Sequence, residues 1–284
     1  MKASRTKILM LMSKLIRKLM PADVQAPRSA LNEILVRSGY FRLRTSVAAH
    51  GLAVPDVQLY RPLFSPWEGE PAFEEIFQRV KDHTLCSRDR CYILWTTLRQ
   101  ALANEGDVLE CGVFRGGTAL LQALTMHASA PRQHRMLHLF DSFEGMPETV
   151  QGVDRLKRGD LGGTSVTRVE GLLKAFPFAE VHPGFIPATF VGLKVDKVCW
   201  AHIDVDIYQS VRDCISFIYP RLSPGGFMIF DDYGFPSCPG ARRAVDESFA
   251  NSAEVPICLP TGQCLVVKSP IIWPSRSQAS DRMG

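Results

Sequence analysis

The 284-residue sequence predicts an α/β domain built on a doubly wound, mostly parallel sheet. Two observations carry this prediction. From residue 108 onward, short apolar runs alternate with helical patterns. The runs Val198–Ile203 and Phe227–Phe230 each stop at an acidic residue, as expected for buried parallel strands whose carboxyl ends open into a crevice. Ligands of such a sheet bind at the carboxyl ends of its strands, so we expect the functional site there.

The individual elements follow from apolar periodicity and from the residues that break it. A helix over Arg90–Asn104 carries apolar side chains at helical spacing and ends before Gly106. A turn is expected at 222–226, where Pro224 precedes two glycines, and residues 260–263 separate two short apolar runs as in a hairpin. The other expected elements are, in order, a helix Phe73–Lys81, strands Val108–Glu110 and Leu137–Phe140, helices Thr167–Phe176, Ser210–Tyr219 and Ala241–Phe249, and the hairpin strands Pro256–Leu259 and Cys264–Lys268.

Residues 1–22 predict a basic amphipathic helix. They carry six lysines and arginines and no acid, their apolar residues recur at helical spacing, and Pro21 ends the pattern. Three interpretations stay open for this helix: packing on the domain or on a second subunit of a homo-oligomer, contact with a membrane surface, or a targeting peptide. Residues 23–72 are expected to form an irregular extension, 73–270 the main domain, and 271–284 a disordered tail.

Composition excludes several functional classes. A formal net charge of +4 is modest, and the basic residues are not interleaved with aromatics, so no nucleic-acid partner is expected. The eight cysteines form no CxxC pair, which leaves zinc and thioredoxin-like chemistry unsupported and favours a reducing, cytoplasmic compartment. No apolar run approaches the roughly 20 residues that a membrane-spanning helix requires.

A glycine-containing loop follows the first expected strand. Residues 110–118 read Glu-Cys-Gly-Val-Phe-Arg-Gly-Gly-Thr, a pattern in which a strand end, a turn and a helix start form a backbone cradle for a nucleotide-like ligand. The spacing is not that of the dinucleotide fingerprint. Glu110 at the strand end would repel a pyrophosphate but would suit a ligand with an ammonium or sulfonium group. The alternative interpretation is a plain strand-to-helix turn.

The second expected strand ends at Asp141, within His-Leu-Phe-Asp-Ser-Phe-Glu-Gly. An acid at this position can accept hydrogen bonds from both ribose hydroxyls of a nucleoside, although it could also cap the following segment. Together, Glu110 and Asp141 suggest an adenosine ligand with a cationic amino-acid tail. That description fits S-adenosylmethionine better than NAD. His138, in the same run, and His202 are interpreted as hydrogen-bonded core histidines.

Four carboxylates stand at the ends of two later strands: Asp204 and Asp206, then Asp231 and Asp232. Anions gathered at one sheet edge are unfavourable unless a cation or shared protons compensate them. A divalent cation that prefers oxygen ligands would do so, and it would acidify a coordinated hydroxyl whose proton a nearby carboxylate could accept. Capping and turn formation are the simpler explanations for each pair taken alone.

Five ordered segments resemble the macrocin O-methyltransferase (TylF-type) family over about residues 60–268. They read Glu-Cys-Gly-Val-Phe-Arg-Gly-Gly-Thr, Phe-Asp-Ser-Phe-Glu-Gly-Met-Pro-Glu, His-Ile-Asp-Val-Asp-Ile-Tyr-Gln-Ser, Tyr-Pro-Arg-Leu-Ser-Pro-Gly-Gly, and Asp-Asp-Tyr-Gly followed by Gly-Ala-Arg-Arg-Ala-Val-Asp. The resemblance implies a class I methyltransferase fold with a seven-stranded, Rossmann-like sheet. It also implies S-adenosylmethionine and Mg²⁺ as cofactors for O-methylation, typically of a sugar hydroxyl.

The resemblance also assigns roles to residues. It implies that Asp204, Asp231 and Asp232 are metal ligands and that Asp206 is the catalytic base. The residues that it places in the cofactor site are Glu110, Gly112, Phe114, Gly116, Thr118, Asp141 and Ser142. The expected partner is a small-molecule hydroxyl acceptor, glycosylated in the leading interpretation. An NAD-dependent oxidoreductase, methylation of a catechol-like hydroxyl, and a non-catalytic protein of the same fold are the alternatives.

Overall fold

The computed structural model describes residues 65–129 and 135–270. The chain divides into two units, residues 1–64 and 65–284, and the fold reported is that of the second unit. The expected basic helix, most of the irregular extension and the tail 271–284 lie outside the described residues. Within the described ranges, no helix has the length and apolar character needed to cross a bilayer.

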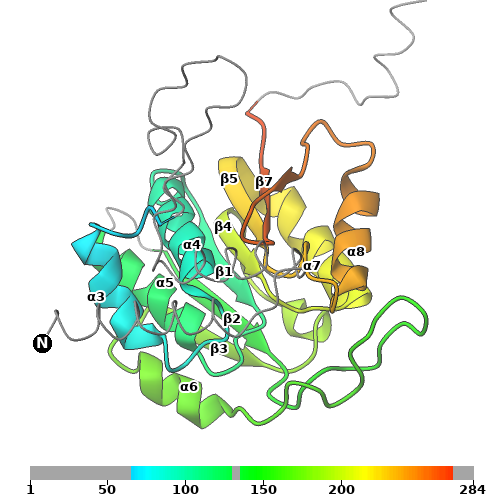
Figure 1. Cartoon of the computed structure of the whole chain (residues 1–284), viewed down its shortest axis with the longest axis horizontal. Coiled ribbons are helices and arrows are strands. Elements are labelled where there is room, and N and C mark those ends of the chain that lie inside the picture. Colours follow the sequence, from blue (N-terminus) through cyan, green and yellow to red (C-terminus); the bar gives the residue numbers. More distant parts are fainter. Residues whose placement is uncertain (1–64, 130–134, 271–284) are drawn as a thin grey trace, which may run out of the picture. The chain divides into compact units, whose positions relative to one another are not determined.

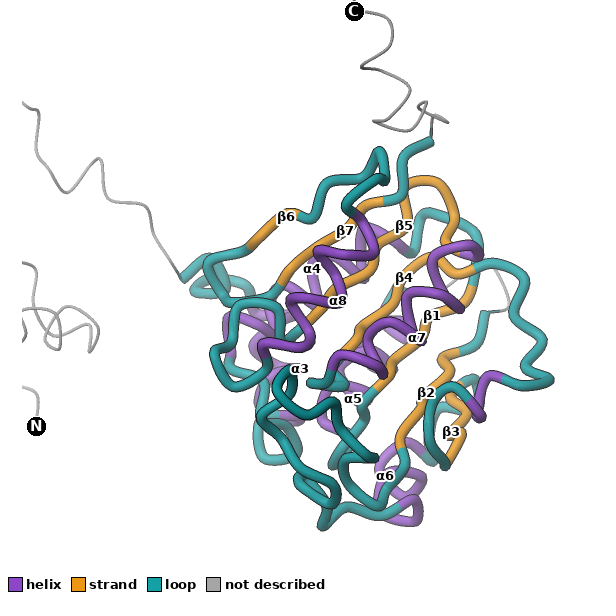
Figure 2. Tube along the Cα trace, turned by 90° about the vertical axis from the view of Figure 1, so that its right-hand side faces the viewer, coloured by secondary structure: helices purple, strands orange, loops and turns teal. Residues whose placement is uncertain are grey.

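The domain is organised by a seven-stranded sheet in the order β3-β2-β1-β4-β5-β7-β6 (Figures 1 and 2). Neighbouring strands from β3 to β5 are parallel, whereas β7 is antiparallel to both β5 and β6. This topology confirms the predicted α/β class and the mostly parallel sheet. The strands are β1 (Asp107–Cys111), β2 (Leu137–Asp141), β3 (Ala179–Pro183), β4 (Val198–Ile203), β5 (Leu222–Phe230), β6 (Ile257–Cys258) and β7 (Cys264–Val267).

Helices cover both faces of the sheet, and each face has its own apolar core (Figure 2). Consecutive strand residues point to opposite faces, so Val108 of β1 belongs to one core and Leu109 to the other. One face is covered by α3 (Pro71–Val80), α4 (Arg88–Ala101), α5 (Gly117–Ala128) and α6 (Val166–Leu173), and the other by α7 (Tyr208–Ile218) and α8 (Pro239–Phe249).

The strand order reverses between β1 and β4. The chain runs outward from β1 through β2 to β3 and then returns to β4 beside β1, so the loops after β1 and β4 leave the sheet in opposite directions. The two strand ends nevertheless approach closely. Gly112 has a φ of +91°, and a Cβ there would lie 1.8 Å from the carbonyl oxygen of Asp204. Only glycine satisfies both constraints at this position.

Most expected elements are observed with ends shifted by a few residues, and two differ in kind. The segment 222–226 is part of β5 rather than a turn, because Leu222 pairs with Val198 and a register irregularity in that ladder accommodates the glycines. No element was predicted for the segment that forms strand β3. It is a five-residue edge strand with alternating partial burial, and it lacks the apolar run that marks the central strands.

Candidate active site

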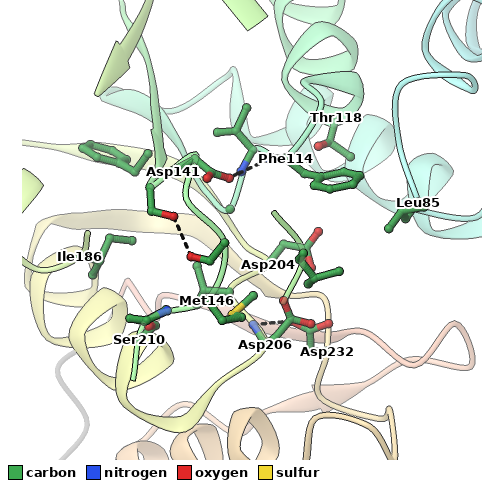
Figure 3. A pocket seen from close by; sticks show the side chains of 18 of the residues that line it. Leu85, Phe114, Thr118, Asp141, Met146, Ile186, Asp204, Asp206, Ser210 and Asp232 are labelled. Atoms are coloured by element: carbon green, nitrogen blue, oxygen red, sulfur yellow. Dashed lines mark hydrogen bonds between the residues drawn. The ribbon is translucent and has the colours of Figure 1, made fainter. Parts of the chain in front are cut away.

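An open cavity of about 220 Å³ lies at the carboxyl ends of the strands, across the point where the strand order reverses (Figure 3). The strand-end segments after β1, β2, β3, β4 and β5 all contribute to its wall, together with the segment that precedes α4. Eight of the eleven predicted site residues line it: Gly112, Phe114, Thr118, Asp141, Ser142, Asp204, Asp206 and Asp232.

Asp141 holds the glycine loop in position. Its Oδ2 accepts hydrogen bonds from the backbone N–H groups of Val113 and Phe114, both at 2.8 Å, and its Oδ1 accepts one from Phe143 N at 2.7 Å. Phe114 has a φ of +50°, a conformation that these hydrogen bonds help to fix. Asp141 therefore borders the cavity as predicted, but its carboxylate also organises the backbone around the cavity.

Glu110 and Gly116 do not line the cavity, and this corrects the expectation that Glu110 faces the charge of a ligand. Glu110 is fully buried, and its Oε1 lies 2.8 Å from His202 Nδ1 on the neighbouring strand β4. Gly116 has a φ of +85° at the start of α5, where a Cβ would lie 3.3 Å from Val169 and Leu172 of α6. Glu110 and Gly116 thus contact neighbouring elements of the fold rather than the cavity.

His202 links Glu110 to Asp231 inside the sheet. Its Nε2 lies 3.4 Å from Asp231 Oδ1, and both side chains are fully buried. Burial alone would lower the pKa of His202, but hydrogen bonds with Asp231 and Glu110 and the charges of Glu110 and Asp204 raise it to about 10. His202 is therefore an imidazolium between two carboxylates, which agrees with its interpretation as a hydrogen-bonded core histidine.

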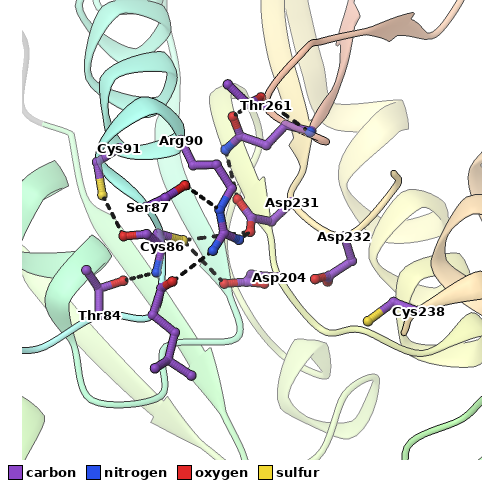
Figure 4. A network of polar contacts seen from close by, with 12 residues as sticks. Thr84, Cys86, Ser87, Arg90, Cys91, Asp204, Asp231, Asp232, Cys238 and Thr261 are labelled. Atoms are coloured by element: carbon purple, nitrogen blue, oxygen red, sulfur yellow. Dashed lines mark hydrogen bonds and ion pairs between the residues drawn. The ribbon is translucent and has the colours of Figure 1, made fainter. Parts of the chain in front are cut away.

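Asp231 is saturated by partners and differs in this from the other three acids (Figure 4). Its Oδ2 forms an ion pair with Arg90 of α4 and accepts a 3.7 Å contact from the Cys86 thiol, while its Oδ1 accepts a 2.8 Å hydrogen bond from Gln263. Although burial opposes ionisation, His202 and Arg90 hold the pKa of Asp231 below its usual value. Asp231 is thus a buried anion whose charge is compensated by Arg90 and His202.

Arg90 is fixed by several contacts. Its Nη2 donates to the carbonyl oxygen of Leu85 at 2.8 Å, its Nε donates to Ser87 Oγ at 3.2 Å, and its guanidinium lies over the ring of Phe235 at 5.1 Å. The side chain is 14% exposed and borders the cavity. Arg90 is therefore a built-in counter-ion for Asp231.

Asp204, Asp206 and Asp232 face the cavity with less compensation. Burial, followed by the charges of neighbouring acids, raises the pKa values of Asp204 and Asp232 well above the ordinary range, and burial raises that of Asp206 to about 6. Asp206 has a φ of +59°, its backbone N–H donates to Asp232 Oδ2 at 3.0 Å, and Cys238 Sγ donates to its Oδ1 at 3.3 Å. The strained backbone aims this carboxylate at the cavity.

The donor set of Asp204 and Asp232 fits a hard divalent cation, because both carboxylates line the cavity, and burial together with the charges of neighbouring acids raises the pKa values of both. The third predicted ligand, Asp231, does not fit in this arrangement, since Arg90, Gln263 and His202 occupy its oxygens. The clusters of potential ligand atoms divide the predicted set in another way, because they group Asp204 with Asp231 and Asp232 with Asp206. At this cavity, potential ligand atoms gather within 4.8 Å of one another in two clusters, Cys86–His202–Asp204–Asp231 and Asp206–Asp232–Cys238.

Two residues that contact Asp231 had no signal in the sequence. Arg90 lies in a helix of ordinary amphipathic pattern, and Gln263 lies in a hairpin loop, so only the packing of α4 and β7 against β5 brings them to Asp231. The cavity mouth also carries exposed apolar side chains: Leu85 (66% exposed), Leu161 (40%) and Phe185 (38%). Exposed apolar residues around an opening indicate a ligand with an apolar part.

Residues 79–259 match the family model described as Macrocin-O-methyltransferase (TylF). The chain is 31% identical over 172 residues to the 8-demethyl-8-(2,3-dimethoxy-alpha-L-rhamnosyl)-tetracenomycin-C 4'-O-methyltransferase of Streptomyces olivaceus, and the match covers 56% of the chain and 66% of the relative. It is 30% identical over 181 residues to the Mycinamicin III 3''-O-methyltransferase of Micromonospora griseorubida, covering 58% and 69%. The chain therefore spans about two thirds of the length of these curated relatives.

Solved structures show the same architecture. The O-methyltransferase NovP superposes with a TM-score of 0.60 at 25% identity, covering 66% of this chain and 82% of its own. CalS11, the calicheamicin methyltransferase, superposes with a TM-score of 0.57 at 18% identity, covering 77% and 99%. The similarity to CalS11 is evidence for the fold alone.

Proposed function

The chain belongs to the macrocin O-methyltransferase (TylF) family, a family of methyltransferases, and from that premise we propose that it transfers a methyl group from S-adenosylmethionine to a sugar hydroxyl of a glycosylated small molecule. The observation that carries the proposal is the cavity itself. It joins the glycine loop and Asp141 on one side to Asp204, Asp206 and Asp232 on the other. A nucleoside cradle and a carboxylate cluster thus open into the same space.

The cofactor is proposed to lie along the β1 and β2 loops. The backbone at Gly112 and Phe114 lines that part of the cavity, and a free lone pair on Asp141 Oδ1 can accept a ribose hydroxyl while the loop hydrogen bonds stay intact. Thr118 and Ser142 line the same side. The transferable methyl would point toward the carboxylates after β4 and β5.

Asp206 is the proposed base. It reaches the cavity on a strained backbone, and a pKa of about 6 leaves it mainly ionised at neutral pH yet basic enough to accept a proton from an alcohol as the methyl group arrives. The Cys238 thiol and the backbone pairing with Asp232 fix its orientation. These contacts position the carboxylate before the acceptor binds.

A divalent cation such as Mg²⁺ is proposed as a second cofactor, held by Asp204 and Asp232. When bound, it would acidify the acceptor hydroxyl and neutralise the clustered carboxylates. The ion pair of Arg90 with Asp231 lies next to Asp204, since ligand atoms of Asp204 and Asp231 lie within 4.8 Å of one another.

The acceptor class rests on the relatives and on the cavity mouth. One relative is named for 4'-O-methylation of a rhamnosyl-tetracenomycin, and another for 3''-O-methylation of mycinamicin III. In this chain, Leu85, Leu161 and Phe185 place apolar surface at the opening. A glycoside can contact both parts of the cavity, with its sugar at the carboxylates and its apolar aglycone against these side chains.

Calorimetric titration and methyl-transfer assays test the proposal separately. S-adenosylhomocysteine should bind the protein, whereas NAD should not. With S-adenosylmethionine and Mg²⁺, glycosides with apolar aglycones should gain the mass of one methylene unit, and the matching aglycones should not. Binding of NAD without S-adenosylhomocysteine would overturn the cofactor assignment. Methylation of aglycones or free catechols would overturn the sugar assignment.

A further inference from the structure

A third cluster of potential metal ligands lies on the edge of the sheet and has no part in the proposed reaction. It consists of His138 on β2 and of Glu180 and His182 on the edge strand β3, and we call it the edge triad. In the parallel ladder, His138 pairs with Glu180 and Phe140 pairs with His182. Residues paired across strands or two apart along a strand share a face, so all three side chains project from the same face.

The three ligand atoms have the separation that a transition metal requires. His138 Nδ1 lies 3.0 Å from His182 Nε2, and Glu180 Oε2 lies 3.7 Å and 3.9 Å from these two nitrogens. A triangle with these sides has a point about 2.1 Å from all three corners, which is the bond length of zinc to imidazole nitrogen and to carboxylate oxygen. One ion can therefore contact all three atoms without movement of the backbone.

The surroundings of the histidines favour ligation. His138 is only 5% exposed, and its Nε2 has no hydrogen-bond partner among the described residues but lies 3.7 Å from Asp107 Oδ2. Asp107 is itself fixed, since its Oδ1 accepts a 2.8 Å hydrogen bond from Met136 N. A carboxylate behind the outer nitrogen of a metal-bound histidine keeps the proton there and frees the inner nitrogen for the metal.

His182 is held in a suitable state by its own neighbours. Its ring stacks on Phe140 with centroids 4.7 Å apart and an interplanar angle of 16°. Burial lowers the pKa of His182, and the neutral form of an imidazole is the form that binds a metal. Glu180 is 56% exposed and provides the route by which an ion can enter.

We propose that the edge triad binds a transition-metal dication, with Zn²⁺ as the preferred ion and water in the fourth position. Two imidazoles and one carboxylate form a ligand set that Zn²⁺ uses and that Mg²⁺ avoids, so this site is chemically distinct from the oxygen-only pair Asp204 and Asp232. The ion would tie β3 to β2. Because Gly184 and Phe185 follow the end of β3 at Pro183 and line the cavity, the ion would also stiffen one cavity wall.

Titration of the full-length, tag-free protein with Co²⁺ in the presence of excess Mg²⁺ tests this proposal. We expect one equivalent of Co²⁺ to produce visible ligand-field absorption, and Zn²⁺ to displace it. His182→Gln and Glu180→Gln should each weaken Co²⁺ binding at least tenfold while leaving affinity for S-adenosylhomocysteine unchanged. The matched control is His127→Gln, which removes an exposed histidine outside the triad and should change nothing.

Three results would overturn the proposal. The first is a wild-type protein that binds no Co²⁺ under these conditions. The second is binding that survives both triad variants. The third is an intense thiolate-to-cobalt charge-transfer band, which would place the ion at the cluster of Cys86, His202, Asp204 and Asp231 instead. Because the Glu180 side chain is largely exposed, its substitution tests ligation without a packing change.

Discussion

Substitution of Arg90 by glutamine should destabilise the domain by removing the cation that holds Asp231. Asp231 is completely buried and the Arg90 side chain is 14% exposed, so the pair is a buried salt bridge. Loss of one partner from such a pair costs about 3–5 kcal/mol. We expect about 3 kcal/mol, at the low end, because Gln263 and His202 remain on the other oxygen of Asp231. For a domain of this size, the loss corresponds to a Tm roughly 6–12 °C lower.

Urea unfolding of the wild type, Arg90→Gln and Arg90→Lys measures this effect. The lysine variant keeps the charge but loses the fork of donors to Ser87 and Leu85, so it should lie between the other two. The difference between wild type and Arg90→Gln should also depend on pH. A lowered pKa means that ionised Asp231 stabilises the fold above pH 3.8 and that this contribution fades as pH falls below that value. A glutamine variant that loses less than about 0.5 kcal/mol at pH 7 would refute the role of Arg90 as counter-ion, since that is the scale of an ordinary surface substitution.

Four further predictions concern the site and the stability of the domain. Asp206→Asn should keep metal and cofactor affinity in calorimetry while the methyl-transfer rate falls by about 10²–10⁴-fold, and a rate near that of the wild type would exclude it as the base. Asp141→Ala should weaken S-adenosylhomocysteine binding by about 1.5–3 kcal/mol for each charge-assisted hydrogen bond lost, and unchanged affinity in a folded variant would remove it from the ribose site. Gly112→Ala should cost more than about 2 kcal/mol in urea unfolding, because its Cβ would collide with the Asp204 carbonyl; a neutral variant would contradict the close approach of β1 and β4. Hydrogen bonds from Ser252, Tyr219 and the Ser269 backbone outweigh burial and lower the pKa of Glu254 to about 2. Its stabilising effect should therefore be present above pH 4.5 and fade as pH falls toward 2, so Glu254→Gln should show a flatter stability profile there than the wild type.

The sequence predicted the central part of the fold accurately because its local signals are strong there. The strand Val198–Ile203 was predicted with its observed limits, since six consecutive apolar or buried residues end at an acid. Weaker signals gave poorer predictions. Strand β3 has only partial burial at a sheet edge, and residues 222–226 combine strand pairing with a Pro-Gly-Gly pattern that normally marks a turn.

The family resemblance, read from five segments, is confirmed by the match over residues 79–259. The α/β class and the seven-stranded sheet are confirmed as well. The assigned roles of Asp206 as base and of Asp204 and Asp232 as metal ligands stay predictions, whereas the oxygens of Asp231, the third predicted ligand, are engaged by Arg90, Gln263 and His202. Glu110 shows the limit of such reasoning: its position at a strand end was predicted, but its side chain points to His202 instead of the cavity.

The sequence by itself determined which residues stand at the ends of strands, because apolar runs, glycines and acids follow one another locally along the chain. It could not determine which acid faces the cavity and which is neutralised inside the sheet. That depends on contacts between residues far apart in sequence, such as Arg90 with Asp231 and Glu110 with His202. Only the tertiary structure decides these pairings, because the cost of burying a charge is offset by a partner whose position no local pattern encodes.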